Sequence, residues 1–342
     1  MADIKVHYYA HGANGSFVLQ HPLVLGHESC GIITALPSSL PPNCALKVGD
    51  RVAPEVGLPC RTCPTCTKGR YNLCPSLRFK SSAKTHPHLD GTLVEYMHHP
   101  LSLLHKLPEG MDLELAALAE PLAVVLHAWH RARLEGGMRI LVIGAGAVGL
   151  LACAVATAYG ASEVIATDIE ESKLSFAQER GWVTGTYTLP RGPRVGGKES
   201  LELAKANWAT MRESNVVKGR GLEDGFDAVI ECTGVETCMQ LAPLASVTGG
   251  KAVFVGMGTQ ELLLPVGLSL IREVDLVGVF RYANTYPEAL ALLGSGKLGD
   301  VGKMITQRYP LHEAGKAFEA LKKGRDEEGN YVIKAMVGSV PE

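Results

Sequence analysis

Four cysteines gathered within fifteen residues form the most specific chemical pattern in the sequence. Their spacing is Cys60-x2-Cys63-x2-Cys66-x7-Cys74. Four thiolates so close along a chain can close a tetrahedral zinc site, with Zn–S distances of about 2.3 Å and no open position, so the expected role is structural. Two alternatives stay open. Pro75 directly after Cys74 would also suit an iron–sulfur cluster, and a pair of disulfides would require an oxidising compartment.

A glycine-rich turn in the middle of the chain predicts a dinucleotide site. Gly144, Gly146 and Gly149 form G-x-G-x-x-G directly after an apolar run and directly before an alanine-rich segment. The first glycine permits the turn, the second lets the backbone approach a pyrophosphate, and the third allows close helix–strand packing. The other interpretation is a strand–helix turn that binds nothing.

The acidic residue that follows this turn favours NAD over NADP. Asp168 lies nineteen residues beyond Gly149, at the end of the next predicted strand, and no arginine follows it immediately. A carboxylate at that place accepts both ribose hydroxyls of NAD and repels the 2′-phosphate of NADP.

Two further apolar runs end in glycine, and the ends of such strands line the ligand crevice of an open α/β sheet. We therefore place residues from these strand ends under the nicotinamide half of the cofactor. The complete predicted cofactor set is Gly144, Gly146, Val148, Gly149, Asp168, Thr233, Gly234 and Gly256.

A second candidate metal site is spread along the chain. His27 and Glu28 follow an apolar run, and Glu120 opens a predicted helix some ninety residues later. Taken alone, His27 is more often a hydrogen-bonded histidine than a ligand, so this pattern is weaker than the four cysteines.

The elements that must position these residues change in type along the chain. Short β segments, such as 22–26 and 91–97, predict a β-rich first 110 residues, and 112–134 is predicted helical. Alternating strand and helix periods through Val279 predict a parallel sheet. Beyond it we expect helices over 286–295 and 311–323 and a strand over 331–337. Part of the polar stretch 190–224 is expected to be a mobile surface loop.

Composition excludes several classes of protein. A chain of 342 residues has room for two domains, and a net charge of −2 offers no footprint for nucleic acid or an anionic membrane. A small-molecule ligand is expected instead. The uncharged run Ile140–Ser162 is long enough to cross a bilayer, but its glycines fall where a strand turns into a helix, so no membrane span is predicted.

Cysteine usage and the first residues indicate a compartment. Nine cysteines, four of them clustered, suit a metal site in a reducing compartment better than a secreted disulfide scaffold. The opening residues lack the apolar core of a signal peptide. We therefore expect a cytoplasmic protein.

Taken in order, the motifs resemble the medium-chain zinc alcohol dehydrogenases, and most of all their polyol branch of sorbitol, xylitol and L-arabinitol dehydrogenases. The resemblance runs from about Val6 to Val337 and includes Gly278-Val-Phe-Arg-Tyr-Ala-Asn-Thr-Tyr-Pro. It implies an α/β fold with a GroES-like, β-rich catalytic domain over 1–122, carrying the four-cysteine zinc lobe at 57–77. A Rossmann NAD-binding domain with a doubly wound parallel sheet is expected over 123–280, and 281–342 returns to the catalytic domain.

The resemblance also implies site residues. His27 and Glu28 correspond to catalytic zinc ligands, and Glu120 binds the metal or the water it holds. Tyr8, Arg281 and Tyr282 map onto residues that hold the hydroxyls of the polyol. The implied reaction transfers a hydride from a secondary alcohol to NAD, because zinc lowers the pKa of the alcohol. Family members usually form homotetramers or homodimers.

The N-terminus departs from the family pattern. Ala2 stands where the family has a cysteine zinc ligand, and Asp3, Ile4 and Lys5 replace the rest of that segment. About forty residues of N-terminal β-structure are missing as well, so the GroES-like domain is expected to lack its first strands. We expect an N-terminally truncated gene model rather than a degraded relative, because the other motifs remain.

Three function hypotheses follow from these patterns. The leading one is a zinc- and NAD-dependent polyol dehydrogenase that produces a ketose. A catalytically impaired NAD-binding relative is the second, supported by the absent cysteine. A zinc dehydrogenase for threonine or another alcohol is the third. A zinc-independent reductase of the same superfamily is disfavoured, because such relatives usually lack the four-cysteine lobe.

Overall fold

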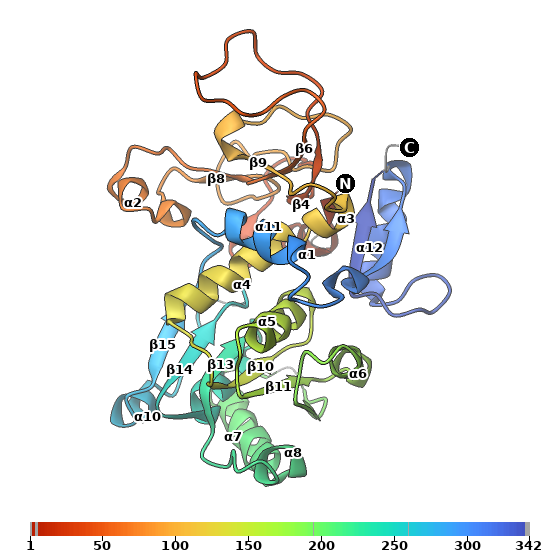
Figure 1. Ribbon diagram of the computed structural model, residues 1–342. Coiled ribbons are helices and arrows are strands. Elements are labelled where there is room, and N and C mark those ends of the chain that lie inside the picture. Colours follow the sequence, from red (N-terminus) through yellow and green to blue (C-terminus); the bar gives the residue numbers. More distant parts are fainter. Residues whose placement is uncertain (1, 4–5, 194, 259, 339–342) are drawn as a thin grey trace. The chain divides into compact units, whose positions relative to one another are not determined.

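The computed structural model describes residues 2–3, 6–193, 195–258 and 260–338 (Figure 1). The chain divides into two compact units. Unit 1 comprises Met1–Ala123, Ala283–Lys297 and Val301–Glu342, and unit 2 comprises Val124–Tyr282 and Leu298–Asp300.

Unit 2 is built on one six-stranded parallel sheet. Its strands are β10 (Arg139–Ile143), β11 (Glu163–Asp168), β12 (Gly185–Thr188), β13 (Phe226–Glu231), β14 (Ser246–Phe254) and β15 (Asp275–Gly278). They lie in the order β12-β11-β10-β13-β14-β15, and every neighbouring pair is parallel. This order reverses between β10 and β13, as in two mononucleotide-binding halves joined at a switch point. The predicted doubly wound sheet is confirmed.

Helices cover both faces of this sheet. The helices between residues 119 and 271 are α4 (Ala119–Ala132), which begins in unit 1, α5 (Ala147–Ala158), α6 (Glu171–Glu179), α7 (Gly197–Glu213), α8 (Asn215–Lys218), α9 (Glu236–Ala245) and α10 (Val266–Ile271). Figure 1 shows α5 and α6 on one side of the strands and α7 on the other. Leu141 and Ile143 of β10 share a core with Met211 of α7, whereas Val142 faces Gly149 of α5. Successive strand residues point to opposite faces of the sheet, and helices cover both faces. The residues on both faces of β10 must therefore be apolar, which explains the apolar run in the sequence.

Residues 190–193, 195–196 and 219–225 lie outside helices and strands, which agrees with the prediction that part of 190–224 is a surface loop, but no sequence pattern indicated the long helix between them. Residues Gly197–Glu213 form α7, the longest helix of the described part of the chain. Its buried positions are Ser200, Ala204, Asn207 and Met211, which share one helical face although two of them are polar. Ser200 Oγ lies 2.7 Å from Thr237 Oγ1 of α9. A stripe held by polar contacts gives little apolar periodicity, so the sequence pattern missed it.

Unit 1 contains many short strands, as the β-rich prediction required. They are β1 (Ala2–Asp3), β2 (Ala13–Asn14), β3 (Phe17–Val18), β4 (Glu28–Ser29), β5 (Gly31–Ile32), β6 (Arg51–Pro54), β7 (Gly57–Leu58), β8 (Arg78–Phe79), β9 (Leu104–Lys106), β16 (Ile305–Tyr309) and β17 (Lys334–Val337). They form sheets in the orders β16-β17-β1-β4, β5-β6-β9, β7-β8 and β2-β3.

The helices of unit 1 are short as well. They are α1 (Val6–His11), α2 (Pro64–Thr67), α3 (Leu113–Ala116), α11 (Tyr286–Gly294) and α12 (Ala314–Lys323), with 3-10 turns η1 (Tyr71–Leu73), η2 (Leu101–Leu103), η3 (Val301–Met304) and η4 (Leu311–Glu313). Phe318 of α12 packs in a core with Ala335 and Val337 of β17. The predicted helices over 286–295 and 311–323 are thereby confirmed, and the predicted strand over 331–337 begins only at Lys334.

Three other expectations for unit 1 need correction. Segments 22–26 and 91–97 are not strands, although backbone N–H groups of Gly91 and Leu93 donate to Val24 O (2.7 Å) and Leu25 O (3.0 Å). Helix α1 was not expected in a β-rich region. The predicted helix over 112–134 is divided into α3 and α4.

The long uncharged run in the middle of the chain is not a membrane span. Ile140–Ser162 divides into most of β10, the glycine turn and α5. No helix in the described ranges is both long and apolar enough to cross a membrane.

Candidate active site and metal centres

The four clustered cysteines converge in unit 1. Their Sγ atoms all lie within 4.8 Å of one another, and Sγ of Cys74 lies 3.5 Å from Sγ of Cys60. Tetrahedral zinc with thiolates at about 2.3 Å requires sulfur–sulfur distances of roughly 3.8 Å, so the spacing fits this ion. Cys63 is the N-cap of α2 and Cys74 the C-cap of η1, so two short helical turns position the lobe.

Local hydrogen bonds favour the thiolate form of two of the four cysteines, Cys60 and Cys63. Backbone N–H groups of Thr62 and Cys63 lower the pKa of the Cys60 thiol to about 6, and Thr65 lowers the pKa of the Cys63 thiol. Desolvation raises the pKa of the Cys66 thiol to about 12. A bound cation deprotonates coordinating thiols outright. All four cysteines would therefore be thiolates only when a metal ion is bound.

A hydrogen-bond network around the buried Glu55 anchors the lobe to the rest of unit 1. The Tyr71 hydroxyl donates to Glu55 Oε1 at 2.6 Å and accepts the Asn284 N–H at 2.8 Å. The Asn284 side chain donates to Gly69 O at 2.8 Å. His105 Nε2 lies 3.0 Å from Glu55 Oε2. Burial and the neighbouring Glu55 carboxylate raise the pKa of Tyr71, so this hydroxyl stays a donor.

His27, Glu28 and Glu120 also come together, although ninety residues separate the pair from Glu120. Their ligand atoms lie within 4.8 Å of one another, and the residues are 5%, 5% and 4% exposed. Two carboxylates buried side by side are costly without a cation. One imidazole and two carboxylates form a donor set that zinc accepts, so the residues present fit a metal ion. This group contains no cysteine among the described residues.

A lysine that the sequence analysis missed provides a cation beside this group. Lys334 of β17 is 1% exposed and forms an ion pair with Glu28 Oε2. Strand β1 lies between β17 and β4, with Ala2 opposite Ser29 in the register. The only sequence signal for Lys334 was a charged residue inside an otherwise apolar terminal run.

The predicted dinucleotide turn lies at the carboxyl edge of the parallel sheet in unit 2. Gly144 has φ of 98°, a conformation that favours glycine. Gly146 caps α5, and a Cβ built there meets nothing within 4 Å, whereas a Cβ on Gly149 would lie 1.7 Å from Gly144 O. Val148 lies in the first turn of α5. The helix N-terminus therefore has room for an anionic group.

Asp168 ends β11 beside this turn. Its carboxylate accepts the backbone N–H of Ala145 at 2.7 Å and that of Glu170 at 2.9 Å. Arg191, which follows β12, forms an ion pair with Glu170. The fold thus brings Arg191 to the segment that follows Asp168, although no arginine follows Asp168 directly in the sequence. The Glu170 carboxylate already neutralises Arg191.

Thr233, Gly234 and Gly256 come together at the ends of β13 and β14. Gly234 has φ of 70°, and a Cβ on Gly256 would lie 2.2 Å from Gly234 N, so only glycines permit this approach. Glu231, with 0% exposure, accepts the N–H groups of Thr233 (2.6 Å) and Gly234 (3.0 Å). Burial raises the pKa of Glu231. Sequence reasoning missed this carboxylate, which positions the loop.

The three substrate candidates are divided between the units. Tyr8 of unit 1 is 6% exposed, and its hydroxyl accepts the Ala83 N–H at 3.0 Å, which leaves the hydroxyl proton for another acceptor. In unit 2, Tyr282 is 3% exposed, and Arg281 has φ of 53° with its guanidinium 4.9 Å from the Phe280 ring centroid.

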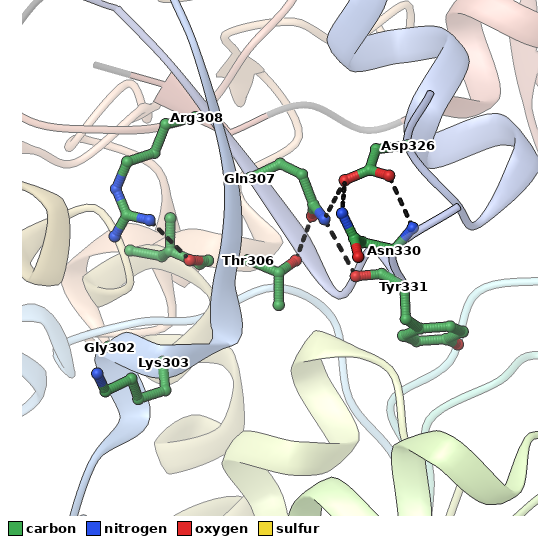
Figure 2. A pocket seen from close by; sticks show the side chains of 9 residues that line it. Gly302, Lys303, Thr306, Gln307, Arg308, Asp326, Asn330 and Tyr331 are labelled. Carbon is green, nitrogen blue, oxygen red and sulfur yellow. Dashed lines mark hydrogen bonds between the residues drawn. The ribbon is translucent and has the colours of Figure 1, made fainter. Parts of the chain in front are cut away.

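A cavity of about 430 Å³ in unit 1 contains none of these residues. Figure 2 shows Thr306, Gln307, Asp326 and Asn330 turned toward one another, with Lys303 and Arg308 apart from them. Gln307 Nε2 lies 3.2 Å from Asp326 Oδ2 and 3.1 Å from Tyr331 O, and Asn330 Nδ2 lies 3.1 Å from Asp326 Oδ2. These side chains tie β16 to the turn before β17, and they are engaged with the protein itself.

Comparisons with known proteins agree with this architecture. Residues 1–109 match the model of the alcohol dehydrogenase GroES-like domain, and residues 147–295 match that of the zinc-binding dehydrogenases.

Curated relatives resemble nearly the whole chain. It is 38% identical to a protein named "Probable D-xylulose reductase A" of Arthroderma otae, over 98% of this chain and 86% of that protein. It is 40% identical to sorbitol dehydrogenase of Mus musculus, over 93% of this chain and 82% of that protein. Among solved structures, L-idonate 5-dehydrogenase from Escherichia coli superposes with a TM-score of 0.82 at 26% identity, covering 99% of this chain and 89% of that one.

Replacing Cys74 with serine should release one tightly bound zinc ion per chain, because three thiolates hold the metal much less firmly. Metal analysis of the purified protein measures this. Cys44→Ser, outside the group, is the matched control and should keep its zinc. Stoichiometric iron, or no metal in the wild-type protein, would contradict the assignment.

Two alanine substitutions in the dinucleotide turn should separate folding from binding. Gly149→Ala forces a Cβ against Gly144 O and should lower the free energy of unfolding by about 1–3 kcal/mol or more. Gly146→Ala has room for its Cβ and should leave stability unchanged while weakening NAD binding, because the pyrophosphate must approach there. Denaturant titration and NAD titration measure the pair. Equal behaviour of the two variants in both titrations would refute this interpretation.

Proposed function

The chain belongs to the zinc-binding dehydrogenases with a GroES-like domain, and from that premise we propose that it oxidises a secondary hydroxyl of a polyol (sorbitol, xylitol or L-arabinitol) with NAD. As a member of that family it is an oxidoreductase. The observation that carries the specific proposal is the buried convergence of His27, Glu28 and Glu120. The names of the relatives, D-xylulose reductase and sorbitol dehydrogenase, support a polyol substrate.

Each residue in the proposal has a defined task. His27, Glu28 and Glu120 would hold the catalytic zinc, and Cys60, Cys63, Cys66 and Cys74 the structural one. When bound, zinc supplies a Lewis acid that lowers the pKa of the substrate hydroxyl, and NAD supplies the acceptor for the hydride. The hydroxyl proton leaves to solvent, the carbon loses a hydride, and a ketose and NADH result. Tyr8, Arg281 and Tyr282 would bind the remaining hydroxyls of the polyol.

The cofactor set would act from unit 2. The amides that follow Gly146 would bind the pyrophosphate, with Val148 in the same helical turn. Asp168 would exchange its present backbone partners for the ribose hydroxyls. Glu231 holds the Thr233–Gly234 loop against Gly256. These residues would form a rigid surface against which the nicotinamide half of the cofactor binds.

A second candidate function is an NAD-binding relative with impaired turnover. Two observations favour it: the buried group has carboxylates but no cysteine among the described residues, and Lys334 already neutralises Glu28. Thiolate is the softer and stronger zinc ligand, so a His-Glu-Glu set binds zinc less firmly. A zinc dehydrogenase for threonine or another alcohol would use the same metal group.

Assembly and location are proposed on separate grounds. We propose a homodimer or homotetramer, supported by the exposed side chains of Leu270 (72%) and Ile271 (81%) and by the edge position of β15. We propose a cytoplasmic location because four clustered cysteines suit a metal site in a reducing compartment better than a disulfide scaffold.

His27→Ala should abolish NAD reduction by sorbitol, xylitol and L-arabinitol, because it removes the imidazole from the buried metal group. NAD binding should stay within a factor of two, since the cofactor residues belong to unit 2. Steady-state absorbance of NADH and NAD titration test both. A zinc-loaded wild-type chain that binds NAD but turns over none of these polyols would favour the impaired relative.

Cofactor choice should depend on Asp168. Asp168→Ser should weaken NAD binding and reduce the preference for NAD over NADP, because the substitution removes the carboxylate that repels the 2′-phosphate of NADP. Adding Glu170→Gln should improve NADP binding further, because it frees Arg191. Glu171→Gln is the control and should change neither affinity. A wild-type chain that prefers NADP in the binding titration would show that this strand end has been misread.

A further inference from the structure

Three histidines outside the sites described above meet on the surface of unit 1. His21 lies on the segment that leads into β4, and His86 and His88 lie on the loop after β8. The ring centroids of His21 and His88 are 4.2 Å apart, and His86 lies 5.4 Å from His21 and 5.7 Å from His88. One ring nitrogen of each lies within 4.8 Å of those of the other two. His21 and His86 are 65 residues apart in the sequence, so the sequence pattern did not indicate that these histidines meet.

Hydrogen bonds set the tautomers of two of these rings. His88 Nδ1 lies 2.8 Å from Thr85 O, and His21 Nδ1 lies 3.0 Å from Pro22 O. A carbonyl oxygen can only accept, so each Nδ1 carries the proton and each Nε2 keeps its lone pair. This is the arrangement of a metal-binding histidine, whose other ring nitrogen donates to a backbone carbonyl.

Each of these two lone pairs accepts one backbone N–H, which a metal ion would have to displace. The Gln20 N–H donates to His88 Nε2 at 3.0 Å, and the His88 N–H donates to His21 Nε2 at 3.3 Å. The carboxylate of the neighbouring Asp90 accepts the Val24 N–H at 3.0 Å and is not part of the group. Three neutral imidazoles without a carboxylate suit a divalent transition metal better than calcium or magnesium.

We propose that His21, His86 and His88 form a binding site for a divalent transition-metal ion such as zinc or nickel. Three imidazole ligands at about 2.1 Å need nitrogen–nitrogen distances of roughly 3.4 Å. Coordination would replace the amide hydrogen bonds to Nε2 of His88 and of His21, and His86 is exposed and can rotate toward these two rings. Solvent water would complete the coordination.

An ion at this place would join two segments that already run together. The Gly91 N–H donates to Val24 O at 2.7 Å, and the Thr92 N–H donates to Gly26 O at 2.8 Å. Gly26 directly precedes His27. The ion would therefore stiffen the segment that carries the buried metal group, without touching that group.

The test uses the full chain, first loaded with zinc and dialysed, and then titrated with nickel by calorimetry. We expect one nickel site in the wild-type chain. His86→Gln and His21→Gln should each weaken it at least tenfold, because each removes a ligand. His98→Gln changes an exposed histidine of the same unit outside the group and should leave it unchanged.

X-ray absorption at the nickel edge gives the second readout. Three imidazole nitrogens and no sulfur are expected, which distinguishes this site from the four-cysteine lobe. His27→Ala should keep the nickel site, so failure of the proposed dehydrogenase function would leave this result unaffected. Equal nickel binding by His86→Gln and His98→Gln, or sulfur in the nickel shell, would overturn the proposal.

Discussion

The ion pair between Lys334 and Glu28 is the contact on which unit 1 depends. Both groups are buried, and a buried charge without a partner costs several kcal/mol. The pair joins β17, near the end of the chain, to β4, which carries the Glu28 carboxylate. It therefore fixes the return of the C-terminal segment to the N-terminal half and holds Glu28 beside His27 and Glu120. A zinc ion would add a second cation to the same carboxylate, so metal occupancy and this pair are energetically linked.

Unit 2 follows a different constraint, the close approach of backbone at the carboxyl edge of its sheet. The ends of β10, β11, β13 and β14 meet there, and three contacts between loops leave no space for a Cβ: Gly149 against Gly144, Gly256 against Gly234, and Gly258 against Gly234. Glu231, buried below, holds the Thr233–Gly234 loop through its backbone amides. This packing places the candidate cofactor residues at one edge of the sheet, whereas the four-cysteine lobe in unit 1 depends on the spacing of its cysteines along the chain and on two short helical turns.

Local motifs and periodicity were sufficient for part of the fold. The parallel sheet could be predicted because strands buried on both faces read as apolar runs separated by helices. Helix α7 could not, because its buried face includes Ser200 and Asn207 and depends on partners in α9. Segments 22–26 and 91–97 have strand-like composition, but their pairing is too irregular to form a ladder.

The sequence by itself determined the four-cysteine lobe and the dinucleotide turn, since both are encoded by residues a few positions apart whose backbone geometry is local. Only the tertiary structure decided which distant charges meet. It placed Glu120 beside His27 and Glu28, supplied Lys334 from the far end of the chain, paired Arg191 with Glu170, and assembled His21 with His86 and His88. Electrostatic and ligand-forming contacts act over a few ångströms in space. Separations of 21 to 306 residues along the chain therefore carry no signal for these contacts until the chain has folded.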